Sequence, residues 1–167
     1  TLTDPANDFA TLAVTEARNL SLRDANALIL GEVTAAGTLA VQAGGALSQA
    51  VDSRIQAAGG LTTLNAADIA LANANNDFQT VRIGGGQTVN LRDANELVLD
   101  DVTVSGTLGI QSGTTLSQVA GTRVQAGNGL TTLSGTDITL ANANNNFQSV
   151  SIGAANNVTL VDVNAIT

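Results

Sequence analysis

The ionisable side chains in this chain belong to Asp, Glu and Arg alone, because the sequence contains no His, Cys, Lys or Tyr. A catalytic site would therefore need carboxylates as its general acid and base. Three sets of aspartates recur at one constant interval along the chain, whereas a catalytic pair has no need to recur. We interpret these aspartates as structural turns and predict that the chain is not an enzyme. The three sets are Asp8 and Asp77; Asp24, Asp93 and Asp162; and Asp68 and Asp137.

The tripeptide DAN, at 24–26 and again at 93–95, has the D-x-N start of a calcium-binding loop. An EF-hand loop needs Gly at its sixth position and Glu at its twelfth, and neither copy has either residue there. Each DAN instead precedes an apolar alternation, where Asp and Asn cap turns by bonding nearby backbone. We expect no metal and no cofactor. The predicted structural turn residues are Asp24, Asn26, Asp93 and Asn95.

A cluster of asparagines precedes two of the three phenylalanines, which are the only aromatic residues. The stretches are LANANNDF at 71–78 and LANANNNF at 140–147, with a degraded copy, LTDPANDF, at 2–9. We predict a long corner here, in which the asparagines satisfy their own loop through Asx turns and left-handed conformations. The phenylalanines would fold inward and plug the corner. The predicted corner residues are Asn73, Asn75, Asn76, Phe78, Asn142, Asn144, Asn145 and Phe147.

These motifs belong to a long internal repeat. Residues 7–75 align with 76–144 without a gap, with 36 identities in 69 positions, and a partial third copy covers 145–167. The absence of insertions means that each repeat position has a fixed structural place. We predict a single β-helical domain over 1–167, which we expect to be a segment of a longer chain.

Short strands must position these residues, because apolar pairs at i and i+2 recur along the chain. Examples are Leu20 with Leu22, Leu28 with Leu30, and Leu39 with Val41. The pattern predicts an all-β fold, a right-handed parallel β-helix of about seven three-stranded coils. On this interpretation one 69-residue repeat equals three coils. Each coil would bury its inward Leu, Val and Ile side chains only by stacking on its neighbours.

Composition narrows the range of partners. The formal net charge is −8, which disfavours nucleic acid as a partner. No run of 18 or more apolar residues occurs, so we expect no membrane insertion. Arg54 recurs as Arg123, which predicts a solvated outer face; the alternative is a ligand-binding stripe. We expect this segment to be monomeric, and end-to-end stacking stays open.

The ordered motifs resemble those of a known family. The segment LRDANELVLDDVTVSGTLGIQSGTTLSQ, followed by GLTTLSGTDITLANANNNFQ, is similar to repeats of filamentous-haemagglutinin-like exoproteins. The resemblance implies the repeat shaft of a large bacterial adhesin, exported by two-partner secretion. It also implies an extracellular or cell-surface location, attachment to host or neighbouring cells through the parent protein, and a role in biofilm formation. It assigns no binding residue.

We therefore expect a structural shaft that mediates attachment by extension. Two other functions remain open at this stage: a polysaccharide-active β-helix enzyme, and a stalk whose outer stripe binds glycan or calcium.

Overall fold

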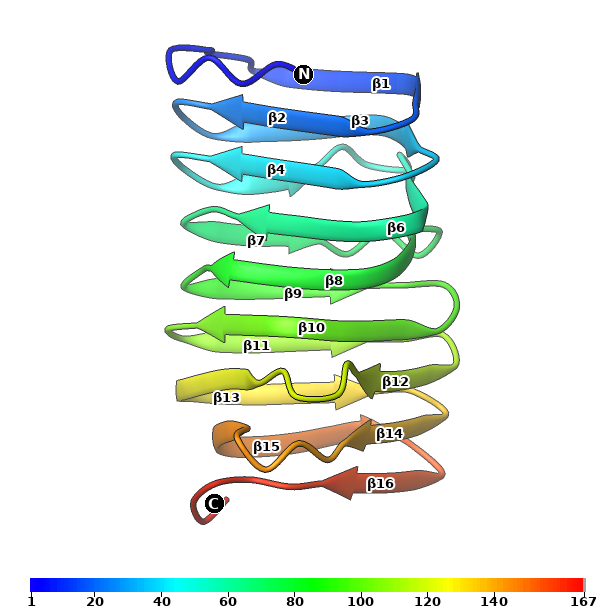
Figure 1. The fold of residues 1–167 in the computed structure, drawn as a ribbon, viewed down its shortest axis with the longest axis vertical. Coiled ribbons are helices and arrows are strands. Elements are labelled where there is room, and N and C mark those ends of the chain that lie inside the picture. The colour runs from blue at the N-terminus through cyan, green and yellow to red at the C-terminus, as the bar shows by residue number, and fades with distance from the viewer. Residues whose placement is uncertain (167) are drawn as a thin grey trace.

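Residues 1–166 are described by a computed structural model, in which the chain winds into a right-handed parallel β-solenoid (Figure 1). The described residues form 16 strands, two per coil, and therefore eight coils. All the strand pairs are parallel, and each coil bonds to the coils before and after it. No helix that is long and apolar enough to cross a membrane occurs in the described part of the chain.

The coils are flattened, so their strands stack in two sheets that face each other across the core. The first sheet, in front in Figure 1, contains the even-numbered strands, and the second sheet contains the odd-numbered strands. The first comprises β2 (Leu20–Asp24), β4 (Leu39–Ala43), β6 (Ile55–Asn65), β8 (Asp77–Gly85), β10 (Leu97–Val104), β12 (Thr115–Gln118), β14 (Asp137–Leu140) and β16 (Asn157–Leu160). The second comprises β1 (Thr11–Ala17), β3 (Leu28–Ala35), β5 (Leu47–Gln49), β7 (Asp68–Leu71), β9 (Thr88–Arg92), β11 (Thr107–Gln111), β13 (Val124–Ser134) and β15 (Asn146–Ala154).

The core follows from the alternation in the sequence, because successive side chains of a strand point to opposite faces. Leu22 and Leu91 point inward and are 3% and 2% exposed, as predicted. Phe78 and Phe147 also fold inward and are the largest fully buried side chains. The predicted fold class, a parallel β-helix with an aliphatic core, is confirmed.

The predicted coil count was wrong, since the pairing register gives two strands per coil and eight coils rather than three strands and about seven. Leu20 pairs with Leu39, Leu39 with Thr62, and Thr62 with Val81, so these four residues mark successive coils of the first sheet. Val89 occupies the position of Leu20 in the second copy of the repeat, yet it lies in the second sheet. One repeat therefore equals about three and a half coils, not three.

The error came from two apolar segments that resemble separate strands in the sequence. Residues 33–35 continue β3 around a bend, and residues 55–57 and 61–65 are the two halves of β6. At these bends β3 pairs with both β5 and β6, which joins the two sheets. A single bent strand therefore gives two separate apolar alternations in the sequence, which we counted as two strands.

The half-coil offset has a geometric consequence for the long loops. The loops at 50–54 and 72–76 leave the second sheet and enter the first, so they lie at one edge of the solenoid. Their repeat mates at 119–123 and 141–145 leave the first sheet and enter the second, so they lie at the opposite edge. Equivalent features of successive repeats thus point to opposite sides of the shaft.

Candidate functional site

The wide corners, residues 72–78 and 141–147, contain the asparagine clusters and lie against the loop of the preceding coil. Asn76 is fully buried there. Its Oδ1 accepts hydrogen bonds from the Ile55 backbone N–H, at 3.0 Å, and from Gln49 Nε2, at 2.7 Å. Its Nδ2 donates to Gln49 Oε1, at 2.9 Å, and to the Leu71 carbonyl, at 3.1 Å. The Asn76 amide therefore uses both donors and both acceptor positions inside the protein.

The second wide corner repeats this network at the opposite edge. Asn145 is fully buried, and its Oδ1 accepts from the Val124 N–H, at 2.8 Å, and from Gln118 Nε2, at 2.7 Å. Its Nδ2 donates to Gln118 Oε1 and to the Leu140 carbonyl. Because the same four bonds form twice, the network is a property of the repeat.

Each corner has at least two further asparagines, of which the first forms side-chain hydrogen bonds to the preceding coil and the second is exposed. Asn73 Nδ2 donates to the carbonyls of Ala50 and Ser53, at 2.7 and 2.9 Å, and Asn142 makes the equivalent two bonds. Asn75 and Asn144 are exposed. The corner is thus wide and folds its phenylalanine inward, as predicted, but most of its asparagine bonds reach the preceding coil.

The prediction that these asparagines satisfy their own loop in left-handed conformations was wrong. Among the described residues the only non-glycine residue with positive φ is Asp52, at 60°. The asparagines instead bond to the preceding coil. There Asn73 donates to two carbonyls of the 50–54 loop, and Asn76 accepts from the buried N–H of Ile55, which directly follows that loop. Of the side-chain bonds described above, only those from Asn76 to the Leu71 carbonyl and from Asn145 to the Leu140 carbonyl stay within the asparagine's own loop.

The DAN turns join the wide corner to the following coil. Asp93 is 1% exposed, and its Oδ2 accepts from the Asn95 N–H at 2.8 Å, which is the predicted turn. Its Oδ1 accepts from the Phe78 N–H at 2.6 Å, a contact between neighbouring coils that sequence reasoning missed. The same pair of bonds forms at Asp24 with Phe9 and Asn26, and at Asp162 with Phe147 and Asn164. Asn26 and Asn95 contribute through their backbone and are exposed.

Burial changes the acidity of one of these turns. The pKa of Asp93 is raised to about 6, mainly because burial in the core removes the carboxylate from water. The nearby charge of Asp77 also raises this pKa, whereas the hydrogen bonds from the N–H groups of Phe78 and Asn95 lower it. No group of three or more potential metal-ligating Asp or Glu side chains occurs among residues 1–166. The repeating aspartates are therefore not gathered into one cluster of that kind.

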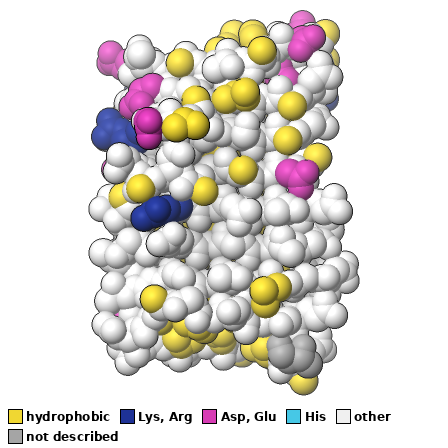
Figure 2. Space-filling view, turned by 180° about the vertical axis from the view of Figure 1, so that it is seen from behind, with side chains coloured by type: hydrophobic (Ala, Val, Ile, Leu, Met, Phe, Trp, Pro, Cys, Tyr) yellow, Lys and Arg dark blue, Asp and Glu magenta, His cyan; other side chains and the backbone are white. Residues whose placement is uncertain are grey.

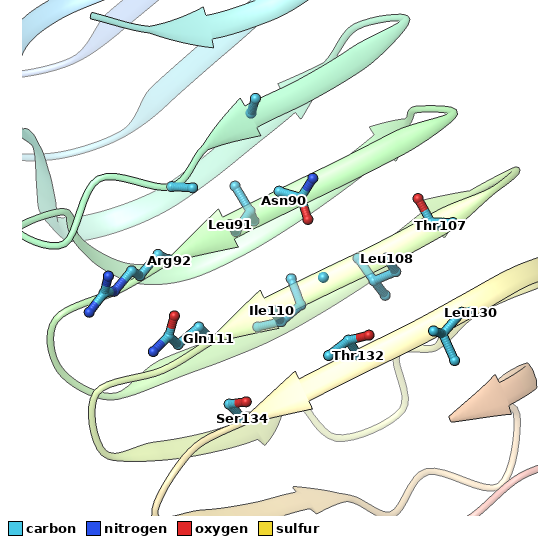
Figure 3. A pocket seen from close by; sticks show the side chains of 13 residues that line it. Asn90, Leu91, Arg92, Thr107, Leu108, Ile110, Gln111, Leu130, Thr132 and Ser134 are labelled. Carbon is cyan, nitrogen blue, oxygen red and sulfur yellow. The ribbon is translucent and has the colours of Figure 1, made fainter. Parts of the chain in front are cut away.

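A groove lies elsewhere, on the outer face of the second sheet. It is shallow, has a volume of about 560 Å³ and runs across β7, β9, β11 and β13. Asn90, Arg92 and Gln111 line it together with Thr107 and Thr132 (Figure 3). Gly109 contributes no side chain and forms part of its floor. No residue predicted as a site residue lines this groove; the signal that could have revealed it is the change from Ala40 in the first repeat to Gly109 in the second.

The repeated arginines are placed near the wide corners. Arg54 pairs with Glu32 across 3.6 Å and donates to Gln56 Oε1 at 2.9 Å. Arg54 and Arg123 each also donate their backbone N–H to an acid of the preceding coil, Glu32 and Asp101. They lie at opposite edges, so they do not form the continuous stripe that one alternative required.

Comparison with known proteins identifies one family. A family model described as repeats of unknown function (DUF5649) matches residues 17–83 and again residues 86–154. The two matches together cover most of the chain. Searches of curated proteins and of solved structures found no match.

Proposed function

The chain belongs to this family of repeats of unknown function, and we propose that it is the structural shaft of a secreted bacterial adhesin. In this proposal the shaft holds a binding region away from the cell surface and mediates attachment or biofilm formation by extension. It carries out no catalysis. The adhesin assignment is based on the resemblance of its repeat motifs to those of filamentous-haemagglutinin-like exoproteins.

The observation that carries the shaft role is the hydrogen-bond connection between coils at each wide corner. Asn73 and Asn76 bind the coil before them, and the N–H of Phe78 binds Asp93 in the coil after them. Three successive coils are therefore joined by side chains as well as by strand pairing. A rod needs stiffness between coils, and these contacts supply it in every repeat.

The length of such a rod increases by a fixed amount with each added repeat, and this gives a direct physical test. Coils stack at a strand spacing of about 4.8 Å, so one added repeat lengthens the rod by about 17 Å. Chains with one, two and three inserted repeats should show a maximum dimension that rises in equal steps in small-angle X-ray scattering. A maximum dimension that grows much less than this, with a rising cross-section, would show bending or collapse and would contradict the shaft.

The adhesin part needs a test in the organism that makes the protein. Surface labelling with an antibody against the repeats should detect them on intact cells. Removal of one whole repeat keeps the register of the remaining coils, so export should persist while attachment to surfaces falls. A cytoplasmic location, or attachment unchanged after several repeats are removed, would refute this assignment.

A further inference from the structure

The groove on the second sheet differs from the corners because its polar side chains have no partner within the protein. Arg92 forms no ion pair, and the side chains of Asn90, Gln111 and Thr132 form no hydrogen bond, among residues 1–166. In Figure 3 these four side chains project from neighbouring strands on the same side of the sheet, while Leu108 and Ile110 lie on its other side. The groove therefore presents a guanidinium, two amides and a hydroxyl that are free to bind a ligand.

The floor of the groove is apolar and low. Ala70 and Gly109 lie in it, and Leu130, which is 46% exposed, lies along its margin. Figure 2 shows this side of the molecule, whose surface is largely uncharged, with few acidic side chains. Such a surface suits a ligand with both hydroxyl groups and apolar C–H faces, which describes a sugar ring.

The charge in the groove selects among such ligands. Arg92 is the only charged residue that lines it, on a chain whose net charge is −8. A guanidinium binds a carboxylate through two parallel hydrogen bonds, and such charge-assisted bonds are the strong ones. An anion would otherwise be repelled by this protein, so a local cation without an acidic partner is a specific feature.

We propose that this groove binds a linear polysaccharide that carries carboxylates, with Arg92 holding a carboxylate and the amides and hydroxyls holding ring hydroxyls. This goes beyond the shaft function, because it gives the segment a ligand of its own. It does not depend on the adhesin assignment, and the shaft could extend without binding anything.

The repeat provides a matched control for the proposal. The positions equivalent to Asn90, Arg92 and Gly109 are Ser21, Arg23 and Ala40, on the first sheet half a coil out of phase. The first copy of the repeat thus has the equivalent arginine, Arg23, but the methyl group of Ala40 occupies the position where Gly109 leaves the groove open. Thr38, which is equivalent to Thr107, also bonds to Asn19 rather than remaining free.

The first experiment is calorimetric titration of the full chain with linear oligosaccharides of galacturonate, alginate and hyaluronan, and with the methyl esters of each. Binding of at least one acidic oligosaccharide is expected, and its ester should bind about tenfold more weakly, since one charge-assisted hydrogen-bond pair is lost. Arg92→Ala should weaken binding about tenfold as well. Arg23→Ala should leave it unchanged.

Gly109→Ala tests the shape of the groove separately from its charge. An added Cβ would meet Asn90 Oδ1, the end of a side chain without a hydrogen-bond partner, and Ala40 shows that the fold accepts a methyl group at this repeat position. The variant should therefore fold but bind the acidic oligosaccharide several-fold more weakly. The proposal is overturned if no acidic oligosaccharide binds, or if Arg92→Ala and Arg23→Ala weaken binding equally. Neither result would affect the length test of the shaft.

Discussion

The wide corners and the groove on the second sheet are both rich in amides, but they use them in opposite ways. In the corner every polar atom of the Asn76 side chain is bonded inside the protein, and the residue is fully buried. In the groove Asn90 and Gln111 are exposed, and their side chains form no hydrogen bond to another described residue. The presence of an Asn or Gln side chain therefore does not by itself indicate a function. Its burial and its hydrogen-bond partners show whether it is structural or available to a ligand.

The contrast also separates stability from binding. A buried amide that loses its partners leaves unsatisfied groups in the core, which costs far more than the bond itself gained. An exposed amide exchanges its hydrogen bonds with water at little cost. Substitutions in the corner should therefore change folding, and substitutions in the groove should change only what binds there.

The largest effect is expected for Asn76→Ala, because it removes four hydrogen bonds and leaves the Ile55 N–H buried without a partner. The free energy of unfolding should fall by about 3 kcal/mol. Urea denaturation followed by circular dichroism measures it. The control is Asn75→Ala in the same loop, where the side chain is exposed and the change should stay within about 0.5 kcal/mol. Equal losses in the two variants would show that the network does not stabilise the corner.

The second effect concerns the pH dependence of stability at Asp93. Its folded pKa is raised from 3.8 to about 6, so between these values the folded protein holds a proton that the unfolded chain has lost. Stability from this group is therefore greatest below pH 4, falls as the pH rises towards 6, and changes no further above it. The loss is on the order of 3 kcal/mol at most, since one pKa unit corresponds to about 1.4 kcal/mol.

Asp93→Asn cannot titrate, so the difference in unfolding free energy between the two proteins isolates this group from the other acids. That difference should shift in favour of Asp93→Asn as the pH rises from 4 to 6.5. Thermal or urea unfolding at intervals of half a pH unit measures it. A difference that stays constant across this range would mean that the carboxyl titrates alike in both states.

These two effects also mark what the sequence can and cannot reveal. The alternation predicted the fold class and the inward residues, because a strand's side-chain period of two is local. The half-coil offset was not predicted, because it depends on how many residues each coil uses to turn its corners, and residues 33–35 look like a separate strand. The bond between Gln49 and Asn76 joins residues 27 positions apart. The sequence shows that the two residues recur as Gln118 and Asn145. It does not show that they are bonded, because that depends on the number of residues in each coil.

The third prediction concerns two polar groups that are buried like the corner amides but have no hydrogen-bond partner, like the groove amides. Thr62 and Thr131 occupy equivalent positions, point into the core and are fully buried, and their hydroxyls have no hydrogen-bond partner among the described residues. Valine has nearly the same shape without the hydroxyl. Thr62→Val and Thr131→Val should each raise the free energy of unfolding by about 1 kcal/mol, because a buried unsatisfied group is removed. Thr63→Val, next in the same strand but less buried, serves as the control.

The additivity of the two changes tests the same point further. The sites lie one repeat apart, so the double variant should gain about the sum of the single changes. Urea unfolding of the four proteins gives these values. A loss of stability in either single variant would mean that its hydroxyl is bonded in solution, for example to a buried water molecule.

The smallest effect on folding is expected in the groove, and it completes the contrast with the corner. Gln111→Ala removes an amide that bonds to nothing in the described protein, so the free energy of unfolding should change by less than about 0.5 kcal/mol. Its corner counterpart is Gln118→Ala, which breaks both bonds to the buried Asn145 and should cost about 2 kcal/mol. Both replace a glutamine by alanine, so side-chain size and strand propensity cancel in the comparison. If urea unfolding gave the same change for both, the partners of an amide would not decide its role in this fold.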